Sequence, residues 1–303
     1  MRTNSPDIKD VWTVIRNWNQ KDSLAKLLLP IHSRKNSKKT FCLYHKKSNI
    51  TEATWFKHFV SKIENGKIPI ILTWKNSTAD AYNKIIRKHV HKINDLNNYV
   101  VGDYAMFNNF YLSPEDGTSF YTANMIKILE IKNEQRLLFD WTSLLIDEPK
   151  TAIDKAYNLL VKKLSKQKNQ FDIDIFTVER KQNIMQPSPD RTYIVQTIHR
   201  DDSDTYKEYI ETTQEHIEVF FKRYKSKTHT NKLWDAYHKK LKDPYAILSF
   251  GYSITTHKSQ GSTFNDVYVD VDDISQNPDL NEMQHCLYTS ATRASEYLGF
   301  LLG

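Results

Sequence analysis

The sequence predicts an α/β protein in which a parallel sheet is interrupted by a long insertion of β-strands and basic helices. Near the start, the apolar run at residues 68–74 (IPIILTW) is followed at once by a segment with apolar residues at helical spacing. Such a run suits a strand buried on both faces, and a strand followed by a helix is half of a βαβ unit. Strands and a helix return after residue 243, whereas residues 99–242 are mostly short β-patterned stretches and lysine-rich segments.

The N-terminal region is expected to lead into the sheet through a helix and a loop. Residues 10–30 predict one helix, because their apolar residues recur at helical spacing. The basic segment at residues 34–47 is typical of a solvated loop. After the strand at residues 68–74, Ser77 and Asp80 resemble a capping box that begins the next helix, although Asp replaces the usual Glu.

The insertion differs from the flanking segments in its pattern. Glycine and proline break it into short pieces, which is typical of a small barrel or curled sheet. The expected elements, in order, are β-rich stretches at residues 100–112, 120–131 and 135–146, an amphipathic helix at 151–168, a strand pair at 173–178 and 193–198, and a strongly basic helical region at 208–242.

The closing part returns to α/β character. The pattern predicts strands at residues 246–255, 267–271 and 297–302 and a helix at residues 282–291. The simplest organisation is therefore one α/β domain made of residues 1–98 and 243–303, with residues 99–242 inserted between its two parts.

Composition narrows the class of partner and compartment. A net charge of +7 and a pI near 9.0 favour a polyanionic partner, or reflect a lysine-rich genome. Cys42 and Cys286 are far apart in sequence, so we expect a reducing compartment with no disulfide framework and no metal site. The sequence has neither an apolar run long enough for a membrane span nor an N-terminal signal peptide. We therefore expect a soluble intracellular protein with no membrane partner, in the nucleus, the cytoplasm or a viral factory.

The segment at residues 251–271 (GYSITTHKSQGSTFNDVYVDV) carries the most chemical information. It places hydroxyl, imidazole, ammonium and amide groups at a predicted turn from a strand to a helix. Such a turn directs backbone N–H groups and a helix dipole outward, which suits a phosphate. The alternative for a generic sequence is a polar surface loop capped by threonine and serine.

The order of these residues resembles a known motif. ITTHKSQGSTF resembles motif V of superfamily-one DNA helicases, in the branch that contains RecD and Dda, and residues 287–302 (LYTSATRASEYLGFLL) resemble motif VI. Residues 71–87 are similar to motif IV, and residues 100–109 are similar to the start of the SH3-like insertion of these helicases. The resemblance implies a UvrD-like C-terminal domain with a RecA-like motor lobe, and the lysine- and asparagine-rich composition suits a large DNA virus.

The resemblance assigns a catalytic residue and a nucleotide-binding set. Motif VI implies that Arg293 is an arginine finger, because a guanidinium is always charged and can fork onto phosphate oxygens in the transition state. The alternative for a lone arginine is a surface ion pair. The other residues expected along the nucleotide cleft are Gln260, Gly261, Lys258, Asn76 and Asn83.

Two alternatives stay open for these assignments. The two asparagines of motif IV could touch the nucleotide or cap the local turn and helix, and Lys258 could be an ordinary surface lysine. The early part of motif V implies contacts of Thr255, Thr256 and His257 with the phosphates of single-stranded DNA. Trp55 and Trp74 could stack bases, but aromatic residues in such positions are more often core.

One family feature is missing from these 303 residues. They contain no G-x-x-x-x-G-K-[ST] P-loop, and the acidic pair Asp147 and Glu148 lies after motif IV, where a Walker B motif cannot stand. We therefore expect a missing N-terminal RecA-like lobe, lost through fragmentation, gene splitting or degeneration, that binds most of the ATP and Mg²⁺. The predicted function is the C-terminal half of an ATP-dependent DNA helicase. The alternatives are a non-catalytic nucleic-acid-binding remnant and an RNA helicase.

Overall fold

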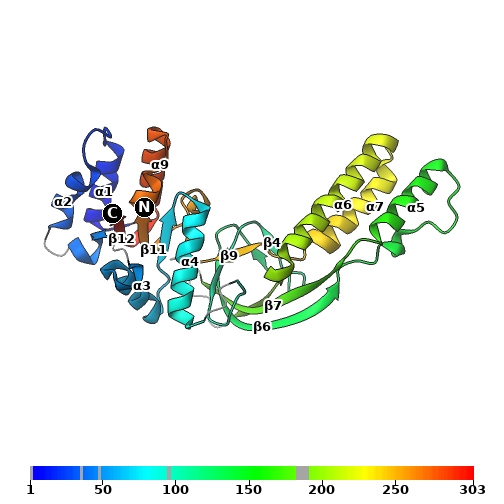
Figure 1. The fold of residues 1–303 in the computed structure, drawn as a ribbon, viewed down its shortest axis with the longest axis horizontal. Helices are drawn as coiled ribbons and strands as arrows, with labels where there is room; N and C mark the ends of the chain where they lie inside the picture. Colours follow the sequence, from blue (N-terminus) through cyan, green and yellow to red (C-terminus); the bar gives the residue numbers. More distant parts are fainter. Residues whose placement is uncertain (1–2, 35–36, 47–48, 94–96, 182–190) are drawn as a thin grey trace.

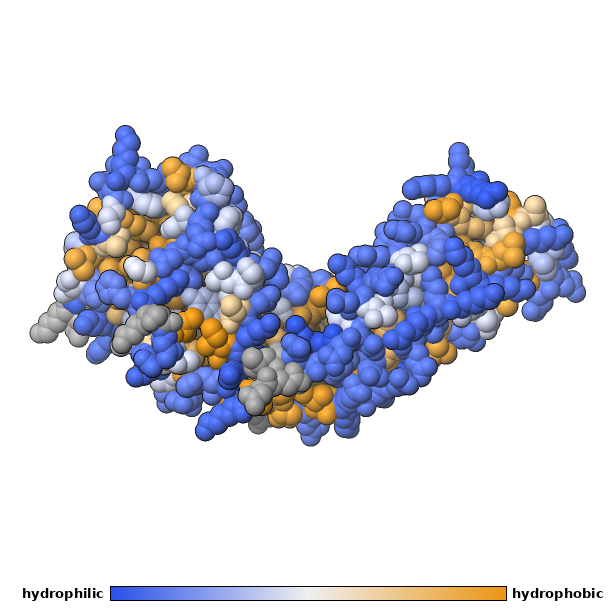
Figure 2. Space-filling view, in the orientation of Figure 1, coloured by the Kyte–Doolittle hydropathy of each residue, from blue (hydrophilic) through white to orange (hydrophobic). Residues whose placement is uncertain are grey.

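The computed structural model describes residues 3–34, 37–46, 49–93, 97–181 and 191–303. Figure 1 shows an elongated molecule: a lobe with both chain ends at one side, a second sheet in the middle, and a helical arm at the other side. Figure 2 shows that the outline is hollowed between the lobe and the arm, and that most of this face is hydrophilic. Within the described residues, no helix has the length and apolar character needed to cross a membrane.

Sheet A forms the centre of the lobe, and all of its strand pairs are parallel, in the order β1-β12-β11-β2-β10. Its central strands are almost wholly buried because helices cover both faces. The predicted parallel α/β lobe is therefore confirmed. The strands are β1 (Phe41–His45), β2 (Ile70–Thr73), β10 (Ser253–Thr255), β11 (Phe264–Asp270) and β12 (Ala294–Leu302).

The helices packed around sheet A correct one prediction. The expected helix at residues 10–30 is two helices, because the first ends at Arg16 and the side chain of Ser23 caps the start of the second. Serine is a strong N-cap residue, so the chain begins a new helix there rather than continuing the old one. The helices of this lobe are α1 (Pro6–Arg16), α2 (Leu24–His32), α3 (Thr54–Glu64), α4 (Asn76–His91), α8 (Val271–Ile274) and α9 (Leu280–Ala291).

The start of α4 corrects a second prediction. Neither Ser77 nor Asp80 caps the helix, which begins at Asn76 with no cap bond from its own N-cap residue. Asp273 takes this role from outside the segment: its carboxylate accepts the backbone N–H groups of Trp74 (2.6 Å) and Lys75 (2.9 Å). A carboxylate at a helix N-terminus also interacts favourably with the helix dipole. A long-range contact therefore replaces the local capping box.

Sheet B occupies the middle of the molecule and is antiparallel, in the order β8-β7-β6-β3-β9, with a small β4–β5 hairpin beside it. The β-rich character expected for the insertion is present, and its likeness to an SH3 barrel stays a prediction. The strands are β3 (Tyr104–Phe107), β4 (Tyr111–Leu112), β5 (Ser119–Phe120), β6 (Met125–Leu137), β7 (Gln170–Lys181), β8 (Thr192–Ile198) and β9 (Leu248–Phe250).

The chain changes sheets where one strand was predicted. Residues 246–255 form β9 in sheet B and β10 in sheet A, with Gly251 between them. A Cβ at Gly251 would lie 3.3 Å from the backbone of Tyr104, so the close approach of the two sheets there favours glycine. The return to sheet A thus begins at Ser253, later than the boundary at residue 243 that the sequence suggested.

The helical arm has its own hydrophobic core. β6 ends at Leu137, and the stretch at 135–146 expected to be β-rich continues instead as a short 3-10 turn. Trp141 in this turn is fully buried and donates its indole N–H to the Tyr209 hydroxyl at 2.9 Å, which fixes the turn against α6. The arm contains α5 (Ala152–Leu164), α6 (Ser203–Tyr224), α7 (Lys227–Ala236) and a π-helical turn at Tyr237–Lys242.

A buried ion pair joins the lobe to sheet B. Arg87 on α4 donates from Nε and Nη2 to the carboxylate of Asp103, at 2.9 and 2.8 Å, and neither side chain is exposed. Burial alone would raise the pKa of Asp103, but hydrogen bonds from His91 and Arg87 hold it below its ordinary value. Arg87, the last residue of the segment similar to motif IV, is therefore a buried structural residue.

Candidate functional site

Motif V begins at the carboxyl end of sheet A. β10 runs beside β2 with Thr255 opposite Thr73, so the residues after both strands emerge at the same edge. The backbone N–H of Thr256 donates to the carbonyl oxygen of Thr73 at 2.7 Å, which extends the strand pairing into the turn. In open parallel sheets, ligands bind outside the carboxyl ends of the strands. Motif V and the segment that resembles motif IV therefore meet at the edge where a ligand is expected.

The turn itself differs from the predicted strand-to-helix turn. Residues His257–Ser259 form a single 3-10 turn, and the chain then returns to β11 without an α-helix. Two successive tight turns hold it: Ser259 N donates to Thr256 O and Ser262 N donates to Ser259 O, both at 3.1 Å. A three-residue turn has no appreciable macrodipole, because the dipole arises from aligned peptides of a longer helix. The helix-dipole argument for a phosphate at this turn is therefore wrong.

The three residues predicted to contact DNA, Thr255, Thr256 and His257, differ in solvent exposure. Thr255 and Thr256 are 5% and 1% exposed, and the hydroxyl of Thr256 lies 2.8 Å from that of Ser290 on α9. The Thr256 hydroxyl therefore holds the turn against α9. The burial of both threonines makes direct phosphate contacts unfavourable, and such contacts stay a prediction. The side chain of His257 is 54% exposed at the carboxyl edge. His257 is thus the candidate best placed to meet a nucleic acid.

Arg293 lies where α9 passes into β12, at the amino end of the sheet. Its Nε donates to Thr289 O at 3.1 Å, Nη1 donates to Ser262 O at 3.1 Å, and Nη2 donates to Thr292 Oγ1 at 3.2 Å. The residue is 8% exposed. The guanidinium therefore ties the last turn of α9 to the end of motif V, and a cation near a helix C-terminus is favourable.

Two more residues predicted to line the nucleotide cleft, Gln260 and Gly261, immediately precede Ser262, which accepts a hydrogen bond from Arg293. Gln260 and Gly261 are exposed, and Gly261 adopts a left-handed φ of +85°, which favours glycine. Both residues line a cavity of about 620 Å³ whose opposite wall includes Arg180 and Lys181 at the end of β7. The sequence analysis missed these two basic residues, because nothing in the local pattern relates the end of an inserted strand to motif V. Lys258 is exposed beside the turn.

The motif IV asparagines have different environments. Asn83 is 3% exposed, donates from Nδ2 to Ser253 O at 2.9 Å, and accepts the N–H groups of Tyr252 and Ser253 at Oδ1, at 3.2 and 2.9 Å. It therefore clamps β10 through both Oδ1 and Nδ2, and its burial leaves almost no side-chain surface for a nucleotide. Asn76 is exposed at the first position of α4 and keeps the possibility of a ligand contact.

The remaining candidates of the sequence analysis have structural positions. Trp55 is 1% exposed in the core, which agrees with the core interpretation, and Trp74 is half-buried with Lys75 Nζ 5.5 Å from its ring centroid. Asp147 and Glu148 are exposed in the helical arm and follow no strand of sheet A. Because a Walker B motif ends a strand of a RecA-like sheet, this position agrees with a chance similarity of Asp147 and Glu148 to that motif.

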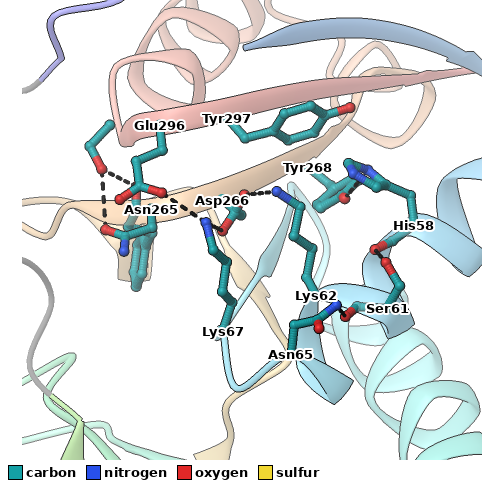
Figure 3. Close-up of polar contacts among 12 residues, drawn as sticks. His58, Ser61, Lys62, Asn65, Lys67, Asn265, Asp266, Tyr268, Glu296 and Tyr297 are labelled. Carbon is teal, nitrogen blue, oxygen red and sulfur yellow. Dashed lines mark hydrogen bonds and ion pairs between the residues drawn. The ribbon is translucent and has the colours of Figure 1, made fainter. Parts of the chain in front are cut away.

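A further polar cluster near the amino end of sheet A is structural (Figure 3). Asp266 is fully buried, and its carboxylate lies 2.7 Å from Lys62 Nζ and 3.9 Å from Lys67 Nζ. Lys67 also pairs with Glu296 at 3.0 Å, so two cations face two anions. Burial of the ring and the nearby charge of Lys62 lower the pKa of His58, which contacts the Tyr268 hydroxyl at 2.8 Å. No sequence motif marks this cluster, which neutralises its own charges.

Comparison with known proteins agrees with the two motifs. Residues 250–301 match the UvrD-like helicase C-terminal domain. The protein R530 of Acanthamoeba polyphaga mimivirus is 47% identical over 303 residues, which is 100% of this chain and 61% of R530. This confirms the resemblance noted in the sequence: residues 250–301 are similar to the UvrD-like helicase C-terminal domain, and the chain has a viral relative. The chain spans about three fifths of the length of that relative.

Two solved helicases show a distant likeness. The Pif1 helicase from Candida albicans is 14% identical, with a TM-score of 0.39, over 99% of this chain and 54% of its own. The Pif1 helicase from Bacteroides, solved in complex with ADP-AlF3 and ssDNA, is 13% identical, with a TM-score of 0.39, over 99% of this chain and 50% of its own.

Proposed function

We propose that this chain supplies the C-terminal motor lobe of an ATP-dependent helicase that translocates on single-stranded DNA. The match of residues 250–301 to a helicase C-terminal domain supports the helicase class. The partner in the nucleotide site is an N-terminal RecA-like lobe with a P-loop, as the motif pattern implies. ATP bound with Mg²⁺ supplies a phosphoryl group whose charge must be stabilised during hydrolysis, and this chain would contribute to that stabilisation from one side only.

The observation that carries the proposal is the path of motif V. Within six residues it runs from His257, exposed at the carboxyl edge of sheet A, to Ser262, whose carbonyl oxygen accepts from Arg293. One short segment therefore connects the surface proposed for DNA with the arginine proposed for the nucleotide. A motor needs such a connection, because nucleotide-dependent movement of one site must change the other.

On the nucleotide side, Arg293 is proposed to act as the arginine finger. Its Nη1 and Nε now donate to neutral carbonyl oxygens of Ser262 and Thr289. A phosphate oxygen carries negative charge and attracts the guanidinium more strongly than a neutral carbonyl oxygen does, so phosphate can displace these partners. Gln260 and Gly261, exposed on the adjoining cavity wall, fit the edge of an anionic ligand, whereas Asn83 does not fit because its amide is buried and holds the backbone of β10.

On the nucleic-acid side, exposed basic groups favour a phosphate backbone. His257 and Lys258 stand at the turn, and the seven lysines from Lys222 to Lys242 in the insertion are all exposed, with Asp235 as the only acid in that segment. Contacts of this kind release counterions and read no base sequence. The insertion is therefore proposed to add non-specific affinity for the DNA backbone.

A second candidate is a nucleic-acid-binding subunit without catalytic activity. The specific observation in its favour is that all three nitrogen positions of the Arg293 guanidinium donate hydrogen bonds within the chain. An arginine whose only role is to cap the C-terminus of α9 would make the same three hydrogen bonds.

The decisive experiment joins this chain to a P-loop lobe, in a longer protein that contains both. ATP turnover is measured without nucleic acid, with single-stranded DNA and with single-stranded RNA. Turnover that DNA stimulates more than RNA supports the DNA helicase. Stimulation by RNA alone would identify an RNA helicase, and nucleic-acid binding without any turnover would support the non-catalytic subunit.

A further inference from the structure

Three side chains of different chemistry converge beside the motif V turn. They are the imidazole of His257, the carboxylate of Glu282 and the thiol of Cys286, and one ligand atom from each lies within 4.8 Å of the other two. His257 comes from the 3-10 turn, while Glu282 and Cys286 are one helical turn apart on α9. Residues at positions i and i+4 of a helix share a face, which explains why both α9 side chains point at the same place.

The surroundings of the trio suit a bound ion. Cys286 is 3% exposed and forms the inner side of the cluster, whereas the His257 and Glu282 side chains are 54% and 45% exposed. His257 Nε2 lies 3.4 Å from Glu282 Oε1, too far for a strong hydrogen bond and close to the separation of two ligands on one small metal ion. An ion could therefore enter from solvent and meet a thiol at the bottom of the cluster.

The donor set selects a class of metal. Nitrogen, sulfur and carboxylate oxygen are the three ligand types of zinc sites, and a thiolate disfavours Mg²⁺ and Ca²⁺, which bind oxygen. Three protein ligands leave the fourth tetrahedral position to water. The two-cysteine count predicted no metal site, because Cys42 and Cys286 are too far apart in sequence; histidine and glutamate brought in by the fold supply the donors instead.

We propose that His257, Glu282 and Cys286 form a site for a divalent transition metal, with Zn²⁺ as the preferred ion. Two ligands come from α9 and one from the motif V turn, so the ion cross-links the turn to the helix. The site does not depend on the function proposed for Arg293, and it shares His257 with the surface proposed for DNA.

Cobalt provides the direct test, because Co²⁺ occupies zinc sites and a cobalt–thiolate bond absorbs in the near ultraviolet. The reduced 303-residue chain, free of any polyhistidine tag, is titrated with Co²⁺ and then with Zn²⁺. We expect one equivalent of Co²⁺ to produce the thiolate band and one equivalent of Zn²⁺ to abolish it. Absence of the band at stoichiometric Co²⁺, with Zn²⁺ not held against a chromophoric chelator, would overturn the proposal.

Variants assign the ligands. Cys286→Ser should remove the thiolate band, and His257→Ala and Glu282→Gln should each weaken Zn²⁺ binding by roughly 100-fold or more, since even an outer-shell change costs 10–100-fold. The last two positions are partly exposed, so both variants are expected to fold. Cys42→Ser is the matched control for the second buried cysteine, and it should keep full binding.

His285, exposed on α9 next to Cys286, provides a control for a neighbouring histidine. His285→Ala should bind Co²⁺ and Zn²⁺ as the wild type does. If Cys286→Ser kept the band, or if the two control variants lost binding as fully as the three ligand variants, the metal would lie elsewhere and the assignment would fail.

Discussion

Replacing Asn83 by alanine tests whether the central asparagine of motif IV is a structural clamp. The change removes three hydrogen bonds and leaves one carbonyl and two N–H groups of residues 252 and 253 without their partner. Each buried group left unsatisfied costs roughly 1–3 kcal/mol. Because β10 is an edge strand, water can reach part of this backbone after the change, so we expect the lower part of the summed range, about 3 kcal/mol. That corresponds to roughly a hundredfold change in the unfolding equilibrium.

The assay is urea denaturation of the variant and the wild type, followed by tryptophan fluorescence, since Trp55 lies in the core of the same lobe. Asn76→Ala is the matched control, because Asn76 is exposed on the same helix, and its effect should stay within about 0.5 kcal/mol. Equal, small effects of both substitutions would refute the clamp and return Asn83 to the list of possible nucleotide ligands.

Three further predictions concern activity. The isolated chain should hydrolyse ATP negligibly, because an arginine finger acts on a phosphate held by a P-loop that these residues lack; steady-state turnover abolished by Arg293→Ala would contradict this. In a protein that includes the P-loop lobe, Arg293→Lys should lower kcat by roughly 10³ with little change in ATP affinity, because lysine lacks the planar fork; near-normal kcat would make Arg293 structural. Single-stranded DNA should bind with an affinity that falls steeply with salt, measured by fluorescence anisotropy, and His257→Ala should weaken binding and reduce the salt slope; affinity independent of salt would rule out phosphate contacts.

The sequence predicted those features that local patterns encode. The parallel lobe could be predicted because β2 is a continuous apolar run and α4 follows it with regular helical spacing. The match of residues 250–301 to a helicase domain followed from the order of residues in motifs V and VI. Both depend on residues close together in the chain, where spacing carries information.

Long-range contacts decided the features that the sequence missed. Asp273 replaced the local capping box of α4, and Arg87 became buried because Asp103, from the start of sheet B, accepts its guanidinium. Gly251 separates two strands that one apolar pattern had joined, because sheet B approaches sheet A there. Resemblance to a motif also does not indicate whether a side chain is buried. Asn83 was therefore grouped with nucleotide candidates that are exposed, although it is buried. In each case the partner is distant in sequence and no local pattern indicates it.

α9 gives the two proposed sites a common support. It has 12 residues and spans roughly 18 Å, and it contacts motif V at both of its ends. Near its start Glu282 faces His257; near its end Ser290 holds the Thr256 hydroxyl and Thr289 accepts from Arg293. In the proposed function, Arg293 must release Ser262 and Thr289 to reach a phosphate. That release removes the bond from Arg293 to Ser262, while the Thr256–Ser290 contact and the bond from the Phe264 N–H to the Arg293 carbonyl oxygen remain. Nucleotide binding would therefore loosen residues 260–262 and leave anchored the turn that is proposed to contact DNA, so the movement would be concentrated between the two proposed sites.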